Sequence, residues 1–194
     1  MTSAEDLAAT ALDSIRSWVP LSPAQSALRE EYVAFVEEGR GDVIFRGGAE
    51  HLTGSCFVLT PDLLHVLLCF HRKGQFWVQV GGHVEPRDES LAAAAFREAR
   101  EESGIVGLEP FEPGGAPVDL HRHALSSRFG TCLVHWDVGY VAFADLEALP
   151  VVSDESEAVA WFRVDRLPPD TPEDFPVRLR TVLEEMTHRR RASD

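Results

Sequence analysis

The chain has 194 residues, of which 44% are hydrophobic and 26% are charged, and it carries 18 Lys and Arg and 32 Asp and Glu. This length and composition are typical of one globular domain with an appendage. The net charge of −14 argues against nucleic acid and membrane surfaces, because both are polyanionic and bind basic patches. We therefore expect no nucleic-acid partner and no membrane partner.

Two helices are predicted at the start of the chain. Residues 4–18 place apolar side chains at helical spacing. The pair Ser22–Pro23 is typical of a capped helix beginning with proline in its first turn, and this second helix is expected to continue to about Glu38. We interpret residues 1–48 as a helical N-terminal appendage.

From about Leu52 onward the pattern changes to short apolar runs separated by turn residues, which predicts strands. The expected strands cover 55–60, 65–70, 75–80, 118–123, 131–144 and 159–164. One helix is expected over 90–103 and another over 172–190. Strands before, around and after a central helix predict an α+β fold, an α/β/α sandwich with a mixed sheet, over residues 49–194.

The helix expected over 90–103 carries an acidic face. Glu98, Glu101 and Glu102 are related as i, i+3 and i+4, so their side chains lie on one side. Carboxylates this close repel each other unless a cation neutralises them, and hard oxygen ligands suit Mg²⁺ or Mn²⁺. Arg97, four residues before Glu101, is placed to hold that side chain. Such a face alone is more often simply solvated, so the interpretation depends on the loop before it.

The segment from Gly82 to Ile105 resembles the Nudix box, G-x5-E-x7-R-E-x-x-E-E-x-G followed by an apolar residue. Seven residues match it in order and spacing: Glu89, Arg97, Glu98, Glu101, Glu102, Gly104 and Ile105. The loop between Gly82 and Glu89 is one residue longer than in the family pattern, and its usual glycine is absent. The resemblance covers about residues 52–168.

The resemblance implies a Nudix-type pyrophosphohydrolase that cleaves a diphosphate bond in a small molecule. Its substrate would be a nucleoside diphosphate linked to another moiety, such as a nucleoside triphosphate, ADP-ribose or a nucleotide sugar. The implied ligands of Mg²⁺ or Mn²⁺ are Gly82, through its carbonyl, and Glu98, Glu101 and Glu102. Glu89 is expected to support the loop or to share an outer metal.

The resemblance also implies catalytic roles. Glu98, Glu101 and Glu102 act with the metal, and Arg97 orients a glutamate. A general base is required. We favour Glu155, which comes just before the strand at 159–164, and Glu101 or Glu102 are the alternatives.

Basic residues near the box are candidates for binding the substrate phosphates. His83 lies inside the box loop, and Arg72 lies at a strand end before it. A turn residue and a solvated hairpin end are the alternative interpretations. Asp119, His121 and His123 alternate onto one strand face, which favours an exposed edge or a substrate-contacting surface over a zinc site.

Three further expectations complete the sequence interpretation. Cys56, Cys69 and Cys132 lie in apolar runs without C-x-x-C spacing, which indicates reduced core residues in a cytoplasmic protein. A homodimer is left open by the resemblance. A catalytically inactive Nudix-fold regulator that only binds its ligand is the alternative function, and the intact helix carboxylates argue against it.

Overall fold

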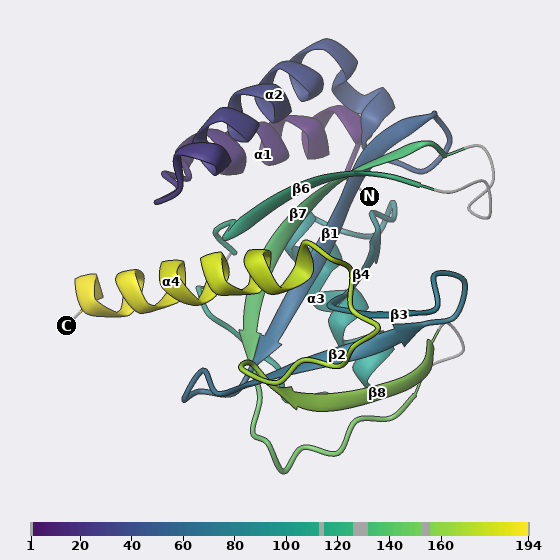
Figure 1. The fold of residues 1–194 in the computed structure, drawn as a ribbon. Helices are drawn as coiled ribbons and strands as arrows, with labels where there is room; N and C mark the ends of the chain where they lie inside the picture. Colours follow the sequence, from purple (N-terminus) through teal and green to yellow (C-terminus); the bar gives the residue numbers. More distant parts are fainter. Residues whose placement is uncertain (1, 113–114, 126–131, 153–155, 194) are drawn as a thin grey trace.

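An eight-stranded sheet lies at the centre of the protein, and helices cover both of its faces (Figure 1). The structure is a computed structural model that describes residues 2–112, 115–125, 132–152 and 156–193. Its strands are β1 (Glu50–Leu59), β2 (His65–His71), β3 (Phe76–Val78), β4 (Val80–His83), β5 (Glu109–Pro110), β6 (Asp119–Ala124), β7 (Val134–Phe143) and β8 (Ser156–Arg163). Its helices are α1 (Ala4–Ser17), α2 (Pro23–Gly39), the short 3-10 helix η1 (Arg40–Val43), α3 (Leu91–Ser103) and α4 (Phe175–Ser193).

Strand β1 organises the sheet. It pairs in parallel with β7 along its whole length, from Glu50 beside Val134 to Leu59 beside Phe143. Its other edge is shared by β4, which pairs with residues 53–56, and by β2 at its C-terminal end. Both of these pairings are antiparallel, so the sheet is mixed, as predicted.

Side chains of β1 alternate between the two faces, as the pleat of a strand requires. Leu52, Cys56 and Val58 belong to the core beneath α3, whereas Phe57 and Leu59 belong to the core beneath α4. The two helices therefore lie on opposite faces of one sheet (Figure 1). This confirms the predicted α/β/α sandwich.

The N-terminal helices pack onto the same core as α3. Leu7, Ile15 and Tyr32 are fully or almost fully buried in that cluster. On α2, the side-chain amide of Gln25 accepts a hydrogen bond from the N–H of Leu120 and donates one to its carbonyl oxygen. Helix α2 thus satisfies backbone groups at the edge of the sheet that would otherwise be exposed for pairing. The division of the chain at residue 48 stays a prediction.

The strand boundaries differ from the sequence prediction where polar residues enter buried strands. Strand β1 begins at Glu50 and not at residue 55, because parallel pairing with β7 extends it through His51 and Thr53. Gly81–Gly82, which follow the strand expected over 75–80, lie within β4 and pair with β1. Strand β7 is described from Val134, and the expected start of this strand at residue 131 lies outside the described residues.

Within the described part of the chain, none of the helices combines the length and the apolar character needed to cross a membrane.

Helix α3 lies unusually close to β1 because Gly54 has no side chain. A Cβ atom at Gly54 would lie 2.9 Å from the carbonyl oxygen of Leu91 and 3.2 Å from the Cβ of Ala95. Both neighbours belong to α3, so a larger residue forces the helix away from the sheet.

We predict that Gly54→Ala lowers the free energy of unfolding by about 1–3 kcal/mol through overpacking. Urea denaturation measures this, with Gly107→Ala as the matched control. A Cβ at Gly107 meets no atom within 4 Å, so that variant is expected to stay within about 0.5 kcal/mol of wild type. Equal effects of the two substitutions would contradict close packing at Gly54.

Candidate active site

The acidic face predicted on the central helix is present on α3. The helix begins after Ser90, whose hydroxyl accepts from the N–H of Ala93, and it ends at Gly104 in the left-handed conformation. Ala95 and Ala99, on the side of the helix next to the acidic face, are fully buried against the sheet. Because that side is fixed by packing, the acidic face presents its carboxylates in a defined position.

Two of these carboxylates meet the backbone of β4. Glu102 is 5% exposed, and its Oε2 accepts a hydrogen bond of 2.9 Å from the N–H of Gly81. A Cβ at Gly82 would lie only 2.6 Å from the carboxyl carbon of Glu98. The glycine pair therefore allows the strand and the acidic helix face to approach each other.

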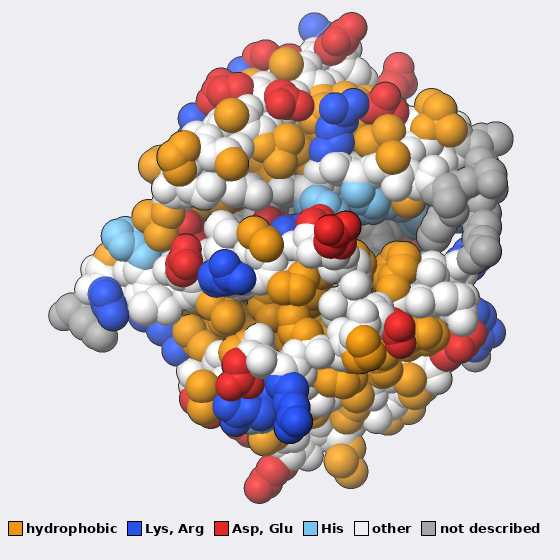
Figure 2. Space-filling model, viewed as in Figure 1, with side chains coloured by type: hydrophobic (Ala, Val, Ile, Leu, Met, Phe, Trp, Pro, Cys, Tyr) orange, Lys and Arg blue, Asp and Glu red, His pale blue; other side chains and the backbone are white. Residues whose placement is uncertain are grey.

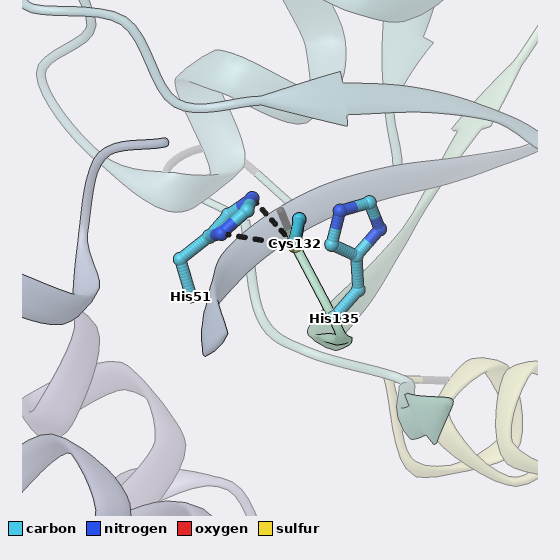
Figure 3. Close-up of side chains that lie close together, drawn as sticks. All are labelled: His51, Cys132 and His135. Atoms are coloured by element: carbon cyan, nitrogen blue, oxygen red, sulfur yellow. Dashed lines mark hydrogen bonds between the residues drawn. The ribbon is translucent and has the colours of Figure 1, made fainter. Parts of the chain in front are cut away.

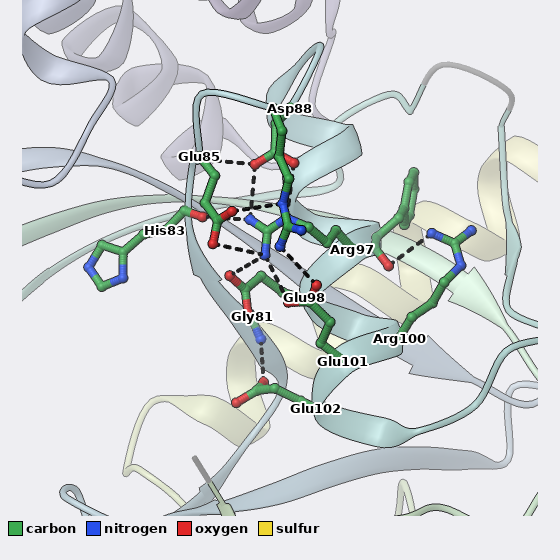
Figure 4. Close-up of polar contacts among 11 residues, drawn as sticks. Gly81, His83, Glu85, Asp88, Arg97, Glu98, Arg100, Glu101 and Glu102 are labelled. Carbon is green, nitrogen blue, oxygen red and sulfur yellow. Dashed lines mark hydrogen bonds and ion pairs between the residues drawn. The ribbon is translucent and has the colours of Figure 1, made fainter. Parts of the chain in front are cut away.

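Arg97 holds the acidic face together (Figure 4). Its guanidinium donates to Glu98 at 2.8 Å, to Glu101 at 3.0 Å and to the carbonyl oxygen of His83 at 2.9 Å. It also donates two hydrogen bonds of 2.9 Å to the carboxylate of Asp88. Hydrogen bonding to Asp88 and Glu98 raises the pKa of Arg97, so the guanidinium stays charged.

Asp88, and not Glu89, anchors this arginine. The side chain of Asp88 is 4% exposed, and its Oδ2 also accepts from the N–H of Glu85 at 2.8 Å, which closes the loop. Burial raises the pKa of Asp88, but hydrogen bonds from Arg97 and Glu85 outweigh it, and the net pKa is lowered. Glu89 is exposed.

Asp88, rather than Glu89, therefore supports the loop, and the alternative that Glu89 shares an outer metal stays a prediction. The loop is also stabilised by Arg87, which pairs with Glu85 at 2.7 Å and with Glu101 at 3.1 Å.

A cleft of about 840 Å³ opens beside the acidic face. Glu102, Gly82 and His83 line one wall, and Arg72 lies on the same cleft with its guanidinium 3.4 Å from the carbonyl oxygen of Ser156. Further cationic lining comes from Arg46 and Lys73. The cleft thus offers positive charge to an anionic ligand although the whole chain is strongly acidic.

Histidines from four strands gather on one side of this cleft. His51 lies beside His135 in the parallel β1–β7 pair, and His123 on β6 lies opposite His135. The ring of His83 on β4 lies 5.0 Å from that of His51 and 5.3 Å from that of His135, between ring centroids. Figure 2 shows histidine side chains in a hollow of the molecular surface. Burial lowers the pKa of His83 to about 4 and of His135 to about 3.

Most of the histidines on this side of the cleft could not be assigned to the site from the sequence. His51 and His135 are far apart in the chain, and only the parallel pairing of β1 with β7 brings them together. The same pairing places Asp137 next to Thr53 and Ser55, whose hydroxyls donate to its carboxylate at 2.9 Å and 2.5 Å. No local spacing in the sequence signals a contact between strands so distant in the chain.

The structure brings most of the predicted site residues together. The junction of β4 with α3 holds Gly82, His83, Arg97, Glu98, Glu101 and Glu102, and Arg72 lines the cleft beside it. Glu155, the favoured general base, lies outside the described residues.

The alternating residues on β6 have separate partners. The buried carboxylate of Asp119 pairs with Arg178 at 2.6 Å, and His121 pairs with Asp174 at 2.8 Å. Asp119 is fully buried, so the interpretation of this face as an exposed edge is wrong at that residue.

The donor set on α3 fits a hard divalent cation. Glu98, Glu101 and Glu102 offer carboxylate oxygens, and the Gly81–Gly82 backbone of β4 lies beside Glu98 and Glu102. Oxygen donors of this kind suit Mg²⁺ and Mn²⁺. Cys69, whose sulfur lies 3.9 Å from Glu102 Oε2, is buried with its pKa raised by burial, and it does not change the hard character of the set.

The NUDIX domain model matches residues 50–185, which is well over half of the chain. The chain therefore belongs to the NUDIX domain family, and its class is that of the Nudix hydrolases. Among curated proteins, no relative matches this chain in sequence.

Solved structures share the fold. A NUDIX-family hydrolase from Clostridium perfringens is 22% identical, with 70% of this chain and 97% of that chain covered and a TM-score of 0.57. An Ap4A hydrolase from C. elegans is 15% identical, with coverage of 71% and 98% and a TM-score of 0.57. A UDP-X diphosphatase is 12% identical, covers 92% of this chain and 89% of its own, and has a TM-score of 0.54.

We predict that Asp88→Asn lowers the free energy of unfolding by about 1.5–3 kcal/mol, because it removes a buried charged partner of Arg97. Urea denaturation at neutral pH measures this. Glu89→Gln, the adjacent exposed acid, is the control and is expected to change stability by less than about 0.5 kcal/mol. A larger loss in Glu89→Gln than in Asp88→Asn would restore Glu89 as the anchor.

The pH dependence of the same pair gives an independent check. A carboxylate with a lowered folded pKa stabilises the protein above its unfolded value, here 3.8, and loses that contribution as the pH falls through the folded value. The stability difference between wild type and Asp88→Asn is therefore expected to shrink as the pH falls below about 4.

Proposed function

We propose that this chain hydrolyses a diphosphate bond in a nucleoside diphosphate linked to another moiety, with Mg²⁺ or Mn²⁺ as cofactor. One observation carries the proposal: Glu98 and Glu102 converge on the Gly81–Gly82 backbone at the wall of a cleft of about 840 Å³. This volume lies within the range of about 300–1,000 Å³ that ligand pockets occupy.

The metal ligands in this proposal are Glu98, Glu101, Glu102 and the carbonyl oxygen of Gly82. When bound there, the ion would supply charge neutralisation at the diphosphate and acidify a water molecule. Arg97 positions two of the ligands, because one nitrogen, Nη1, donates to both Glu98 and Glu101. Fixing these carboxylates before the substrate arrives reduces the reorganisation that the reaction requires.

The substrate phosphates would be bound by Arg72 and His83. Both line the cleft: His83 lies on β4, and Arg72 lies just after β2. A guanidinium donates to two phosphate oxygens at once. The neutral imidazole of His83 offers one N–H donor without adding charge.

Glu155 is proposed as the general base. It directly precedes Ser156, whose carbonyl oxygen accepts from Arg72 at the cleft. Glu101 and Glu102 are the alternatives, and the pH dependence of a Glu155→Gln variant separates them.

The names of the structural neighbours support the substrate class. One is an Ap4A hydrolase and another a UDP-X diphosphatase, and in both names the substrate is a nucleotide joined to a further group through phosphates. We also propose a cytoplasmic location, in keeping with the three free, buried cysteines. The homodimer stays a prediction.

We predict that Glu102→Gln lowers kcat at least about 100-fold, because it removes a charged ligand of the metal ion that would neutralise the diphosphate. The measurement is a hydrolysis screen with Mg²⁺ across nucleoside triphosphates, ADP-ribose, dinucleoside polyphosphates and nucleotide sugars. Glutamine keeps an oxygen for the N–H of Gly81, so the fold is expected to survive. Glu109→Gln, an exposed acid on β5, controls for the loss of one negative charge.

Two outcomes would count against the proposal. Near wild-type turnover in Glu102→Gln would remove this glutamate from the metal site. Tight binding of one of these nucleotides with no turnover, in wild type with Mg²⁺ or Mn²⁺, would favour the ligand-binding regulator. Removal of metal with EDTA is expected to stop turnover, and added Mg²⁺ or Mn²⁺ to restore it.

A further inference from the structure

A second cluster of metal-binding side chains lies on the histidine side of the cleft (Figure 3). It consists of His51 on β1, His135 on β7 and Cys132, which lies just before β7. We infer that these three residues form a binding site for Zn²⁺, separate from the carboxylate face of α3.

The geometry of the cluster supports this inference. One ligand atom from each residue can be chosen so that all three lie within 4.8 Å of one another. The Sγ of Cys132 is 3.5 Å from the Nδ1 of His51. Zinc–sulfur and zinc–nitrogen bonds of about 2.3 Å and 2.0–2.1 Å at a tetrahedral angle require a sulfur–nitrogen separation of about 3.5 Å. The pair therefore already has the spacing of two zinc ligands.

The backbone fixes the third ligand. His51 and His135 are direct partners in the parallel β1–β7 register, and the centroids of their rings lie 4.9 Å apart. The His135 side chain is partly exposed and lines the cleft. Sites on paired strands hold their geometry better than sites on loops.

A fourth coordination position is also accounted for. The ring of His83 lies 5.0 Å from that of His51 and 5.3 Å from that of His135. Cys132, His135 and His83 all line the cleft, so the fourth position belongs either to His83 or to a molecule in the cleft. Three protein ligands with one open position are typical of zinc sites that contact a substrate or water.

The donor atoms distinguish this site from the acidic face. Two imidazole nitrogens and one thiolate select Zn²⁺ over Mg²⁺, whereas carboxylate oxygens favour the harder ion. The ordinary role of Cys132 would be that of a buried core residue. Yet the sulfur of Cys132 faces an imidazole, which a purely apolar core position does not offer.

The test uses Co²⁺ as a spectroscopic substitute for Zn²⁺. Metal-free full-length protein is titrated with Co²⁺ in excess Mg²⁺, which occupies the carboxylate face. We expect one equivalent to bind, with a thiolate-to-cobalt charge-transfer band and the intense visible bands of tetrahedral cobalt. Zn²⁺ is expected to displace it and abolish both signals.

Cys132→Ser is expected to remove the charge-transfer band and to weaken Zn²⁺ binding, measured by calorimetry, by more than about 100-fold, beyond the loss that a supporting residue causes. Cys56→Ser is the matched control, because Cys56 is a buried cysteine on the α3 side of β1 and its loss is expected to leave the band intact. His135→Gln, at a partly exposed position, is expected to change the visible bands while circular dichroism shows an intact fold.

The wild-type protein decides the inference even if a variant fails to fold. No charge-transfer band in wild type, or the same band in Cys132→Ser, overturns the zinc site. Loss of the band in Cys56→Ser with retention in Cys132→Ser assigns the metal to another place and likewise overturns it. None of these measurements uses turnover, so failure of the zinc site and failure of the proposed hydrolysis are distinguishable.

Discussion

The close contact between α3 and the sheet is the constraint on which the site depends. Gly54 and Gly82 have no side chains that would hold the helix and the strands apart. On the helix, the buried alanines of α3 are small and also allow the close approach. The carboxylates of Glu98 and Glu102, at the edge of the packed side of the helix, then reach the β4 backbone. Interiors are packed too tightly to absorb an added methyl group freely, so the glycines determine the position of the acidic face.

That position is electrostatically costly, and the loop before α3 compensates for it. Carboxylates on neighbouring turns repel one another and raise the cost of ionisation. Arg97 lies among them with only 14% of its side chain exposed, and Asp88 holds it from the loop side. The loop, the arginine and the acidic helix thus form one network. In this network Asp88, and not Glu89, supplies the carboxylate that binds Arg97, in a loop one residue longer than the box pattern.

Much of the fold and part of the site could be predicted because their signals are local in sequence. The helical spacing of Glu98, Glu101 and Glu102, the Ser90 cap and the Gly104 end all lie within one helix, and the sandwich follows from the order of strands and helices. The identity of the arginine anchor could not be predicted, because it depends on the path of a short loop. The cluster of His51, His83, His123 and His135 could not be predicted either, because it depends on the register between β1 and β7. More than half of the sheet-forming part of the chain separates these two strands in sequence.

The local and the long-range parts of the cleft also differ in the donor atoms that they offer. The carboxylate donors come from one continuous helix, whereas the nitrogen and sulfur donors come from β1, β7 and the residues just before β7, which meet only in the folded sheet. Hard and soft donors therefore occupy different walls, and a single cleft can distinguish two kinds of cation by position. An anionic ligand bound between them would contact both walls at once. The orientation of that ligand would then depend on which of its phosphate oxygens lies at the acidic helix and which of its groups lies at the histidines. Because the β1–β7 register positions the histidines, it would affect this orientation as much as α3 does.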